Sequence, residues 1–268
     1  MKNKRLEKIL TRKSLSQSSV LKIVSFLTTH EMEEEINIVF SFIKCRLNGL
    51  EYNMNSCYQD SILMSLFCVQ NKFVKNEILK KEKLKPNVEK VRDELVAIYK
   101  TINRKTCCQV KTCDKLRKAL SKCVIEGMEN FHSTEMQDAG EFLQYIFALF
   151  NVKTSPIILV PSYENDITLK CNKNRHFAVF YVQRLLSHRK RQFNSITIPE
   201  YIGKLTIYSI IVHKDNHYTC YLKNNDMWYY YNDLVSEITF VGDFKNVLNC
   251  SIFPNVQTEG VLYFYIKN

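Results

Sequence analysis

The sequence has few of the residues that interrupt regular structure: its 268 residues include only 6 Gly and 5 Pro. Collagen-like and low-complexity chains are therefore excluded. No stretch of 18 apolar residues occurs, so we expect no membrane-spanning helix and no membrane partner. The charged start, Met-Lys-Asn-Lys-Arg, is not followed by an apolar segment and a cleavage site, so no secretory signal peptide is expected. No internal repeat is visible.

Paired cysteines of the Cys-x-x-Cys type are also missing, although the chain has 10 Cys. Cys107, Cys108, Cys113 and Cys123 cluster, but their spacings suit no ordinary zinc site. We therefore expect no metal and no other cofactor. Scattered thiols without a signal peptide indicate a reducing compartment. The expected location is the cytoplasm or nucleus, of a host cell if the source is a virus.

The chain does have enough apolar material for a sizeable core, because 46% of its residues are hydrophobic and 24% are charged. Its net charge of +11 is compatible with nucleic acid or another acidic partner. An AT-rich coding bias explains the many lysines more simply, and the basic run Arg189-Lys190-Arg191 is interpreted as a solvated loop. A nucleic-acid partner is therefore not expected.

The two halves of the chain differ in pattern. Apolar residues three or four positions apart predict a helix over 86–102, and further helices are expected over 115–124 and 139–150. Short β-branched and aromatic runs follow Ser155 and predict strands. These runs are 157–160, 177–182, 205–212, 217–222, 228–231 and 261–266. A helical first half and a strand-rich second half indicate an α+β domain with a mainly antiparallel sheet.

Cys57 lies where the polar segment 53–56 runs into the apolar, helix-compatible stretch 62–67. Ser or Asn before such a run signals a helix N-cap, which places Cys57 in the first helical turn. The helix dipole and the free N–H groups of that turn stabilise a thiolate and can receive an oxyanion. Cysteine is often buried for packing alone, so this setting favours a nucleophile while leaving a core thiol as the alternative.

A nucleophilic cysteine needs a base, and the base needs a group that orients it. His217 begins a predicted strand, and the next aromatic strand, from Trp228, ends in Asn232-Asp233. If these two strands pair as a hairpin, Asn232 or Asp233 returns close to His217, which would complete a triad. His213 is the nearest alternative base, and a surface histidine is the alternative interpretation of His217.

Five segments resemble, in the same order, the sequence boxes of the ubiquitin-specific proteases. Gly49-Leu50 and Asn55-Ser56-Cys57-Tyr58 resemble the cysteine box, and the run from Gln137 to Leu143 resembles the glutamine–aspartate box, which opens a helix. The remaining three matches are 180–185 with Ile198-Pro199, 210–213 with 217–219, and 228–233 with 262–265. The likeness extends over about residues 45–268.

This resemblance implies a papain-like cysteine peptidase domain over 49–268. A helical thumb (49–155) would precede a β-rich palm (156–268), and residues 1–48 would form a helical N-terminal extension. Cys57 would be the nucleophile and His217 the base. Asn232 would orient the imidazole, a role that the adjacent Asp233 shares.

The resemblance also implies the substrate. The enzyme would hydrolyse the peptide or isopeptide bond after the C-terminal glycine of ubiquitin or a ubiquitin-like modifier, with conjugates of these proteins as its partners. The tail of the modifier would pass along a channel formed by Gln137, Asp138, Glu141, Phe142 and Tyr218.

Four positions depart from the family pattern. Tyr52 replaces the usual Asn five residues before the nucleophile, and Asn53 is expected to support the oxyanion instead. Met54 and Asn216 replace two glycines, which removes easy access to positive φ. Asp60 replaces the usual Asn three residues after the nucleophile. These departures leave a second function open: a ubiquitin-binding pseudo-protease or interaction module with weakened catalysis.

The spacing between the boxes also departs from the family. About 80 residues separate Gln137 from His217, which is too few for the zinc-bearing fingers that most members insert between thumb and palm. The fingers are therefore expected to be reduced or absent.

Overall fold

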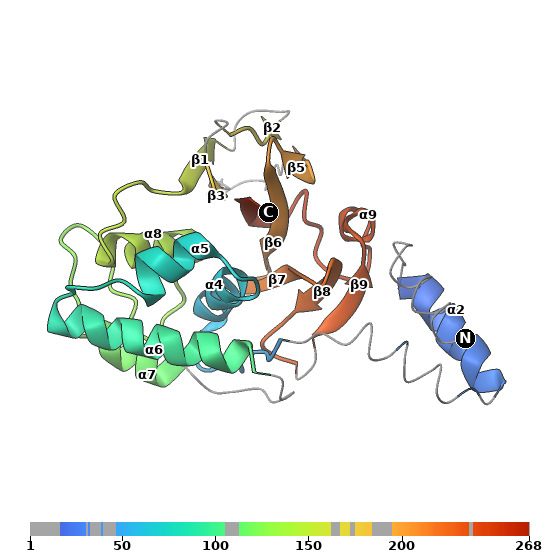
Figure 1. The fold of residues 1–268 in the computed structure, drawn as a ribbon, viewed down its shortest axis with the longest axis horizontal. Helices are drawn as coiled ribbons and strands as arrows, with labels where there is room; N and C mark the ends of the chain where they lie inside the picture. The colour runs from blue at the N-terminus through green and yellow to red at the C-terminus, as the bar shows by residue number, and fades with distance from the viewer. Residues whose placement is uncertain are drawn as a thin grey trace.

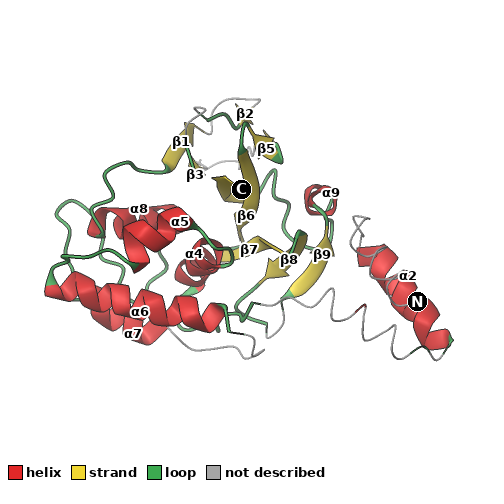
Figure 2. Cartoon of the chain, viewed as in Figure 1, coloured by secondary structure: helices red, strands yellow, loops and turns green. Residues whose placement is uncertain are grey.

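The computed structural model describes residues 17–30, 32, 39, 47–104, 113–161, 167–171, 175–183, 195–235 and 238–267. Helices come mainly from the first part of the chain and strands from the second, and the two groups pack side by side (Figures 1 and 2). The expected α+β class is confirmed. Of the extension 1–48, the structure describes one helix, α2 (Gln17–Thr29), and the domain boundary at 48/49 stays a prediction.

The helices agree closely with the expected ones. They are α4 (Cys57–Phe67), α5 (Lys72–Val74) with the π-helical turn η1 (Lys75–Leu79), α6 (Pro86–Ile102), α7 (Cys113–Leu120), α8 (Ala139–Leu149) and α9 (Phe244–Leu248). Helix α6 has the predicted bounds, because Pro86 occupies the first turn, where its missing N–H costs nothing. Helix α7 ends earlier than predicted, where Cys123 N–H closes a turn on the Leu120 carbonyl. None of the described helices is long and apolar enough to cross a bilayer.

The strands form one large sheet in the order β1-β3-β10-β6-β7-β8-β9. Their bounds are β1 (Ile157–Pro161), β3 (Phe177–Gln183), β6 (Leu205–Lys214), β7 (His217–Asn224), β8 (Met227–Tyr231), β9 (Thr239–Gly242) and β10 (Gly260–Lys267). Strand β1 pairs with β3 in parallel, and the other neighbours along this path are antiparallel. Strand β5 (Tyr201–Ile202) joins β6, while β2 (Ile167–Thr168) and β4 (Ile196–Thr197) form a separate pair. All six expected strands are confirmed.

Two tight hairpins set the register of β6, β7 and β8. Their turns are Asp215-Asn216 and Asn225-Asp226, and all four residues have positive φ between 50° and 64°. Two-residue turns of this kind match the twist of the flanking strands, and Asn and Asp adopt left-handed backbone more readily than other non-glycine residues. Asn216 therefore serves where a glycine was expected, and the predicted pairing of β7 with β8 is confirmed.

The sheet is covered on both faces, and α4 is enclosed within the thumb side. Side chains alternate along β6: Tyr208 belongs to the core beneath the helices, whereas Ile207 belongs to the core on the opposite face. All 11 residues of α4 are buried, and this helix packs against β7, β6, α8 and α6. A helix so enclosed holds its first residue, Cys57, in a fixed place against the start of the palm sheet.

Candidate active site

Cys57 is the first residue of α4 and is 1% exposed. The predicted placement in the first helical turn is therefore confirmed, but Ser56 does not cap the helix with its side chain. Its hydroxyl instead accepts a hydrogen bond from Asn53 N–H (2.8 Å) and donates to the buried Asp60 carboxylate (2.5 Å). The first N–H groups of a helix have no intrahelical acceptor, and at α4 the Ser56 side chain does not cap them.

His217 begins β7 and lies beside the end of β8. Its Nε2 is 3.0 Å from Asn232 Oδ1 and 3.2 Å from Asp233 Oδ1. The imidazole also interacts with the side chain of Cys57 at the start of α4. Strand register explains the meeting, since Cys220 pairs with Tyr231 and the chain then continues toward the start of β7. The structure thus brings together all four residues expected to form the catalytic group.

The surroundings of His217 favour its charged form. Burial lowers the pKa of His217, but its interactions with the side chains of Asp233, Cys57 and Asn232 outweigh this effect, and the pKa is raised to about 10. The Asp233 side chain is 1% exposed, so its charge acts on the imidazole with little screening by water. His217 is therefore protonated at neutral pH and holds a proton that a leaving group can take.

His213, the alternative base, has a different setting. It lies on β6, and its ring stacks on Tyr218 with centroids 4.3 Å apart and planes at 22°. The contacts to Asn232 and Asp233 belong to His217. This geometry favours His217 as the base.

The loop before Cys57 is tied to the palm through Tyr52. Its N–H donates to the Asp233 carbonyl (3.1 Å), and its hydroxyl bonds both the side chain and the N–H of Asn55 (3.0 Å each). Asn53 was expected to support the oxyanion, but its Nδ2 donates to Asp114 Oδ1 on α7 (2.8 Å). The oxyanion role of Asn53 stays a prediction, and one of its amide hydrogens is already engaged.

Arg117, which no sequence pattern singled out, holds the same loop from α7. It is 4% exposed, and its two terminal nitrogens donate to the carbonyls of Asn53 (3.0 Å) and Met54 (2.8 Å). Met54 and Asn55 have φ of 45° and 61°, a left-handed backbone that is unfavourable for methionine. In the sequence, the amphipathic pattern of this helix could have indicated that Arg117 lies near the buried face, because it follows the apolar Leu116, which is buried in the structure.

Asp138, an expected channel residue, joins the thumb to the palm. It is the N-cap of α8, and its Oδ1 accepts the N–H groups of Gly140 (2.7 Å) and Glu141 (2.9 Å). The same carboxylate accepts the hydroxyls of Tyr181 (2.8 Å) and Tyr218 (3.2 Å). A Cβ at Gly140 would lie 2.4 Å from the Tyr181 ring, so only glycine allows this approach.

The other expected channel residues differ in exposure. Gln137 is half-buried and Glu141 is exposed. Partial burial, with repulsion from Asp138 and Glu129, raises the pKa of Glu141. Phe142 is fully buried among core aromatics. Its side chain therefore supports the wall from inside the core, which corrects the expectation that it lines the channel.

Two sequence features fall largely outside the described residues. Cys107, Cys108 and the basic run 189–191 are among the residues not described, whereas Cys123 is buried and free. Among the described residues, no group of three His, Cys, Asp or Glu side chains could hold a metal ion.

Comparison with known proteins gives a likeness in structure alone. No family model matches the sequence, and a search of the curated proteins finds no match. A chain of the SAGA DUB module Ubp8/Sgf11/Sus1/Sgf73 bound to monoubiquitin aligns with a TM-score of 0.53 and 15% identity, covering 84% of this chain and 70% of that one. A second structure, of the Ubp8-Sgf11-Sgf73-Sus1 SAGA DUB module, aligns with a TM-score of 0.50 and 15% identity, with 84% and 68% covered.

The fold is like that of a ubiquitin-specific protease. At 15% identity the likeness establishes the ubiquitin-specific-protease fold and nothing of the chemistry. The roles of Cys57, His217, Asn232 and Asp233 within this fold are therefore argued below from their own geometry.

Proposed function

We propose that this chain is a thiol-dependent deubiquitinase that hydrolyses the bond after the C-terminal glycine of ubiquitin or a ubiquitin-like modifier. One observation carries the proposal: Cys57 begins a buried helix beside His217, whose Nε2 faces Asn232 and Asp233. A cysteine, a base and an orienting group in contact are the parts that nucleophilic catalysis requires. The likeness to a deubiquitinating module that was solved with monoubiquitin supports ubiquitin as the first modifier to test.

The reaction follows from this arrangement. At neutral pH the thiol proton lies on His217, and the Cys57 thiolate attacks the glycine carbonyl carbon to give a tetrahedral oxyanion. N–H groups of the first turn of α4 supply donors for that oxygen. As the intermediate collapses, the C–N bond breaks and the leaving amine takes the proton from His217, which leaves a thioester on Cys57.

A water molecule completes the cycle. It gives one proton to His217 and attacks the thioester carbonyl carbon, and the C–S bond then breaks. The modifier leaves with a C-terminal carboxylate, while Cys57 and His217 return to their starting state. Asn232 and Asp233 hold the imidazole throughout, and Asp233 stabilises its charge.

Three further features belong to the proposal. Conjugates of ubiquitin or a ubiquitin-like protein are the partners, and the cytoplasm or nucleus is the location. The modifier tail runs past Gln137, Asp138, Glu141 and Tyr218 on its way to Cys57. The small number of residues between Gln137 and His217 supports a fingers region that is reduced or absent.

The test is covalent labelling by ubiquitin that carries a C-terminal propargylamide. The wild-type chain is expected to gain the mass of one ubiquitin, and Cys57→Ala is expected to abolish this adduct. Cys250→Ala removes another free thiol and serves as the matched control that keeps labelling. If the folded wild type stays unlabelled by ubiquitin and by several ubiquitin-like probes, the proposed activity is wrong.

A binding module without catalysis is the second candidate, and the loop at Tyr52–Ser56 favours it. An asparagine amide is missing at position 52, and the Asn53 amide engages Asp114. In that case Cys57→Ala and wild type would bind unmodified ubiquitin equally well, and neither the wild type nor any loop variant would form the adduct.

A further inference from the structure

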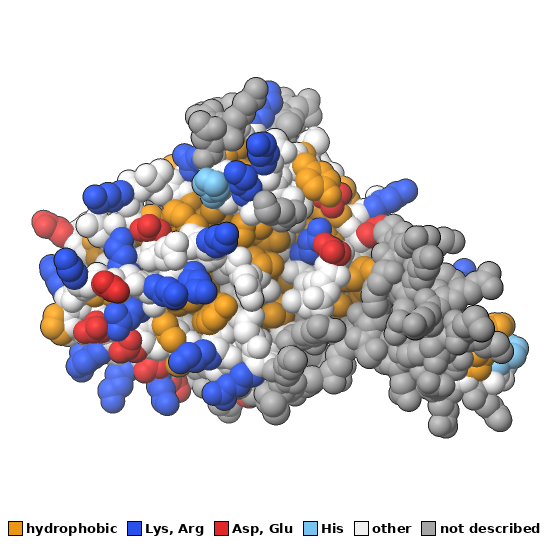
Figure 3. All heavy atoms as spheres, in the orientation of Figure 1, with side chains coloured by type: hydrophobic (Ala, Val, Ile, Leu, Met, Phe, Trp, Pro, Cys, Tyr) orange, Lys and Arg blue, Asp and Glu red, His pale blue; other side chains and the backbone are white. Residues whose placement is uncertain are grey.

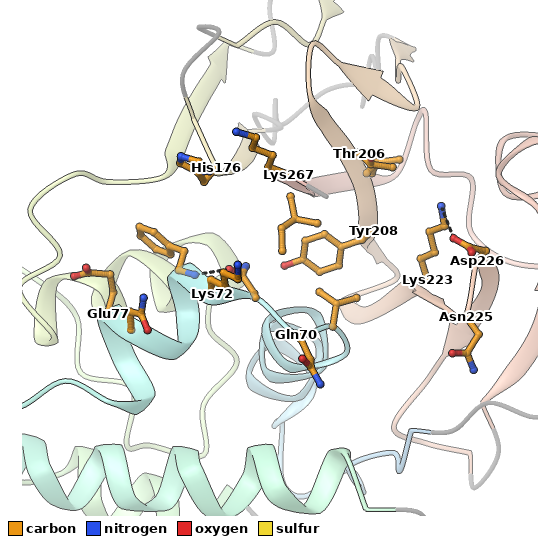
Figure 4. Close-up of a pocket in the computed structure, with 16 residues that line it drawn as sticks. Gln70, Lys72, Glu77, His176, Thr206, Tyr208, Lys223, Asn225, Asp226 and Lys267 are labelled. Carbon is orange, nitrogen blue, oxygen red and sulfur yellow. Dashed lines mark hydrogen bonds and ion pairs between the residues drawn. The ribbon is translucent and has the colours of Figure 1, made fainter.

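A cavity of about 880 Å³ lies at the other end of α4 from Cys57 (Figure 4). Its lining comes from the residues that follow α4, from α5 and η1, from the start of β6 and from the end of β10. The 11 residues of α4 separate it from Cys57 by roughly 16 Å at 1.5 Å per residue. Its volume is in the range that holds a small molecule.

Two polar groups at the base of this cavity are buried and unpaired. Tyr208 is 2% exposed and Asn71 is 5% exposed. Within the described part of the chain, neither the Tyr208 hydroxyl nor Asn71 Nδ2 has a hydrogen-bond partner. Figure 4 shows the Tyr208 ring extending from β6 among the residues that line the cavity. Buried donors without acceptors are rare in folded proteins, and each one costs free energy that a bound acceptor would recover.

The Tyr208 hydroxyl is a neutral donor. Burial and the nearby Cys68 thiol raise the pKa of Tyr208 well above 10, and the Asn71 amide opposes this rise. Asn71 approaches the hydroxyl without meeting it in hydrogen-bond geometry. Both side chains therefore have a hydrogen to offer to a ligand at neutral pH.

The two acidic side chains at the rim of the cavity already have cationic partners. Glu77 is 3.1 Å from Lys81, and Asp226 is 3.6 Å from Lys223. These pairs leave little uncompensated negative charge around the opening.

The remaining charge at the rim is positive. Lys72 and Lys267 both line the cavity, and among the described residues no carboxylate lies within 4.0 Å of either. His176 is exposed on the same rim. In Figure 3, Lys and Arg side chains and a histidine surround an apolar area near the centre of this face. Lysine ammonium groups bind carboxylate and phosphate as point charges.

Part of the cavity wall is apolar. Val69, Phe73 and Ile266 line the cavity and are only partly buried against the core. A ligand body placed against them would remove this surface from water.

We propose that this cavity is a binding site for a small amphiphilic anion: a carboxylate or phosphate attached to a ring-shaped or apolar body. The anion lies between Lys72 and Lys267 and accepts hydrogen bonds from Tyr208 and Asn71. The body packs on Phe73 and Ile266. Because this site is separate from Cys57, it goes beyond the deubiquitinase proposed above.

The test is isothermal titration of the full chain at constant ionic strength with three probes. Phenyl phosphate and benzoate present the two head groups, and benzyl alcohol is the neutral control. At least one of the two anions is expected to bind with one-to-one stoichiometry and at least tenfold more tightly than the alcohol, and the better of them identifies the head group. If neither anion exceeds benzyl alcohol in affinity, the proposal is overturned.

Variants locate the site. The double variant Lys72→Gln/Lys267→Gln is expected to weaken anion binding at least tenfold, because both ammonium groups contact the ligand. Lys90→Gln/Lys245→Gln makes the same change in net charge at two exposed positions outside the cavity and is expected to bind like wild type. Equal weakening by both double variants would mean non-specific charge attraction and would overturn the proposal.

Tyr208→Phe separates a binding role from a structural one. Affinity is expected to fall several-fold while the melting temperature stays the same or rises, because the hydroxyl has no partner in the free protein. A lower melting temperature with unchanged affinity would instead assign the hydroxyl to the core. None of these readouts needs catalysis, so they and the labelling of Cys57 can fail independently.

Discussion

The two sides of the proposed catalytic cleft are built by different means. On the palm side, His217 and Asn232 are placed by hairpins of a large sheet, in which each strand is fixed by its neighbours. On the thumb side, Cys57 begins a rigid helix, but the loop before it has left-handed residues and depends on a few side-chain contacts, above all those of Arg117. Many backbone hydrogen bonds therefore hold His217 in place, whereas only a few contacts hold the loop before Cys57. Single substitutions should reveal this difference.

The largest effect is expected on the palm side, at the base itself. His217→Ala is expected to lower the rate of cleavage of a ubiquitin C-terminal amide by about 10³-fold or more, because it removes the group that holds the thiol proton and gives it to the leaving amine. His213→Ala removes a ring that stacks on Tyr218, and its rate is expected to stay within about tenfold of wild type. A full loss in His213→Ala with turnover retained in His217→Ala would reverse the assignment of the base.

The next largest effect is expected on the thumb side, at Arg117. Arg117→Ala leaves two carbonyls of the loop without donors, and the rate is expected to fall by about 10–100-fold, since small displacements near reacting atoms are costly. The free energy of unfolding should also fall, by about 1–3 kcal/mol. Arg117→Lys is expected to recover only part of the rate, because one ammonium cannot reproduce the planar fork.

Lys118→Ala is the matched control for Arg117, because Lys118 is the exposed next residue of the same helix. Lys118→Ala should change neither the cleavage rate nor the free energy of unfolding. Rates are to be compared well below the melting temperature of each variant, so that only folded protein contributes. If Arg117→Ala cleaves within twofold of wild type, the loop does not depend on this contact.

The third effect is on the pH dependence of the cleavage rate, and it distinguishes the role of Asp233 from that of Asn232. Asp233→Asn removes the negative charge beside His217, so the pKa of His217 is expected to fall from about 10. The alkaline limb of the pH–rate profile should move to lower pH, and the rate at pH 9 should drop more than the rate at pH 7. Asn232→Ala keeps the charge and should move the limb less. Equal shifts in both variants would contradict the role given to Asp233.

The same pKa shift affects stability. Because the pKa of His217 is higher in the folded protein than its ordinary value of 6.5, protonation favours the folded state. This contribution is fully present below pH 6.5 and is lost as the pH rises toward 10. Urea unfolding at pH 6 and pH 9.5 should therefore show a loss of stability at high pH that is smaller in Asp233→Asn.

The palm side could be predicted from the sequence to a large extent. Period-two alternation and aromatic runs located β6, β7, β8 and β10 within one or two residues, and β7 and β8 were expected to bring the site together if the short turn between them made a hairpin. Strand pairing is a local consequence of such a turn, so the meeting of His217 with Asn232 and Asp233 could be expected.

The thumb side could be predicted only in part. The start of α4 at Cys57 followed from local patterning, but Arg117 lies 64 residues beyond Asn53, whose carbonyl it contacts, and no local pattern encodes that contact. The same holds for Ser56, whose hydroxyl turns to Asp60 instead of capping the helix. The short strands β2, β4 and β5, of two residues each, are too short to show an alternation.

The smallest effect compares the two non-glycine residues that take positive φ where glycine was expected. Met54→Gly should relieve left-handed strain of about 1–2 kcal/mol, offset by about 0.5–1 kcal/mol from the greater freedom of the unfolded chain. Met54 is 61% exposed, so little buried surface is lost. Asn216 already tolerates left-handed backbone, and Asn216→Gly should gain nothing or lose slightly. Urea unfolding of both variants measures the difference, and a larger gain for Asn216→Gly would mean that the strain lies on the palm side, contrary to the contrast drawn between the two sides of the cleft.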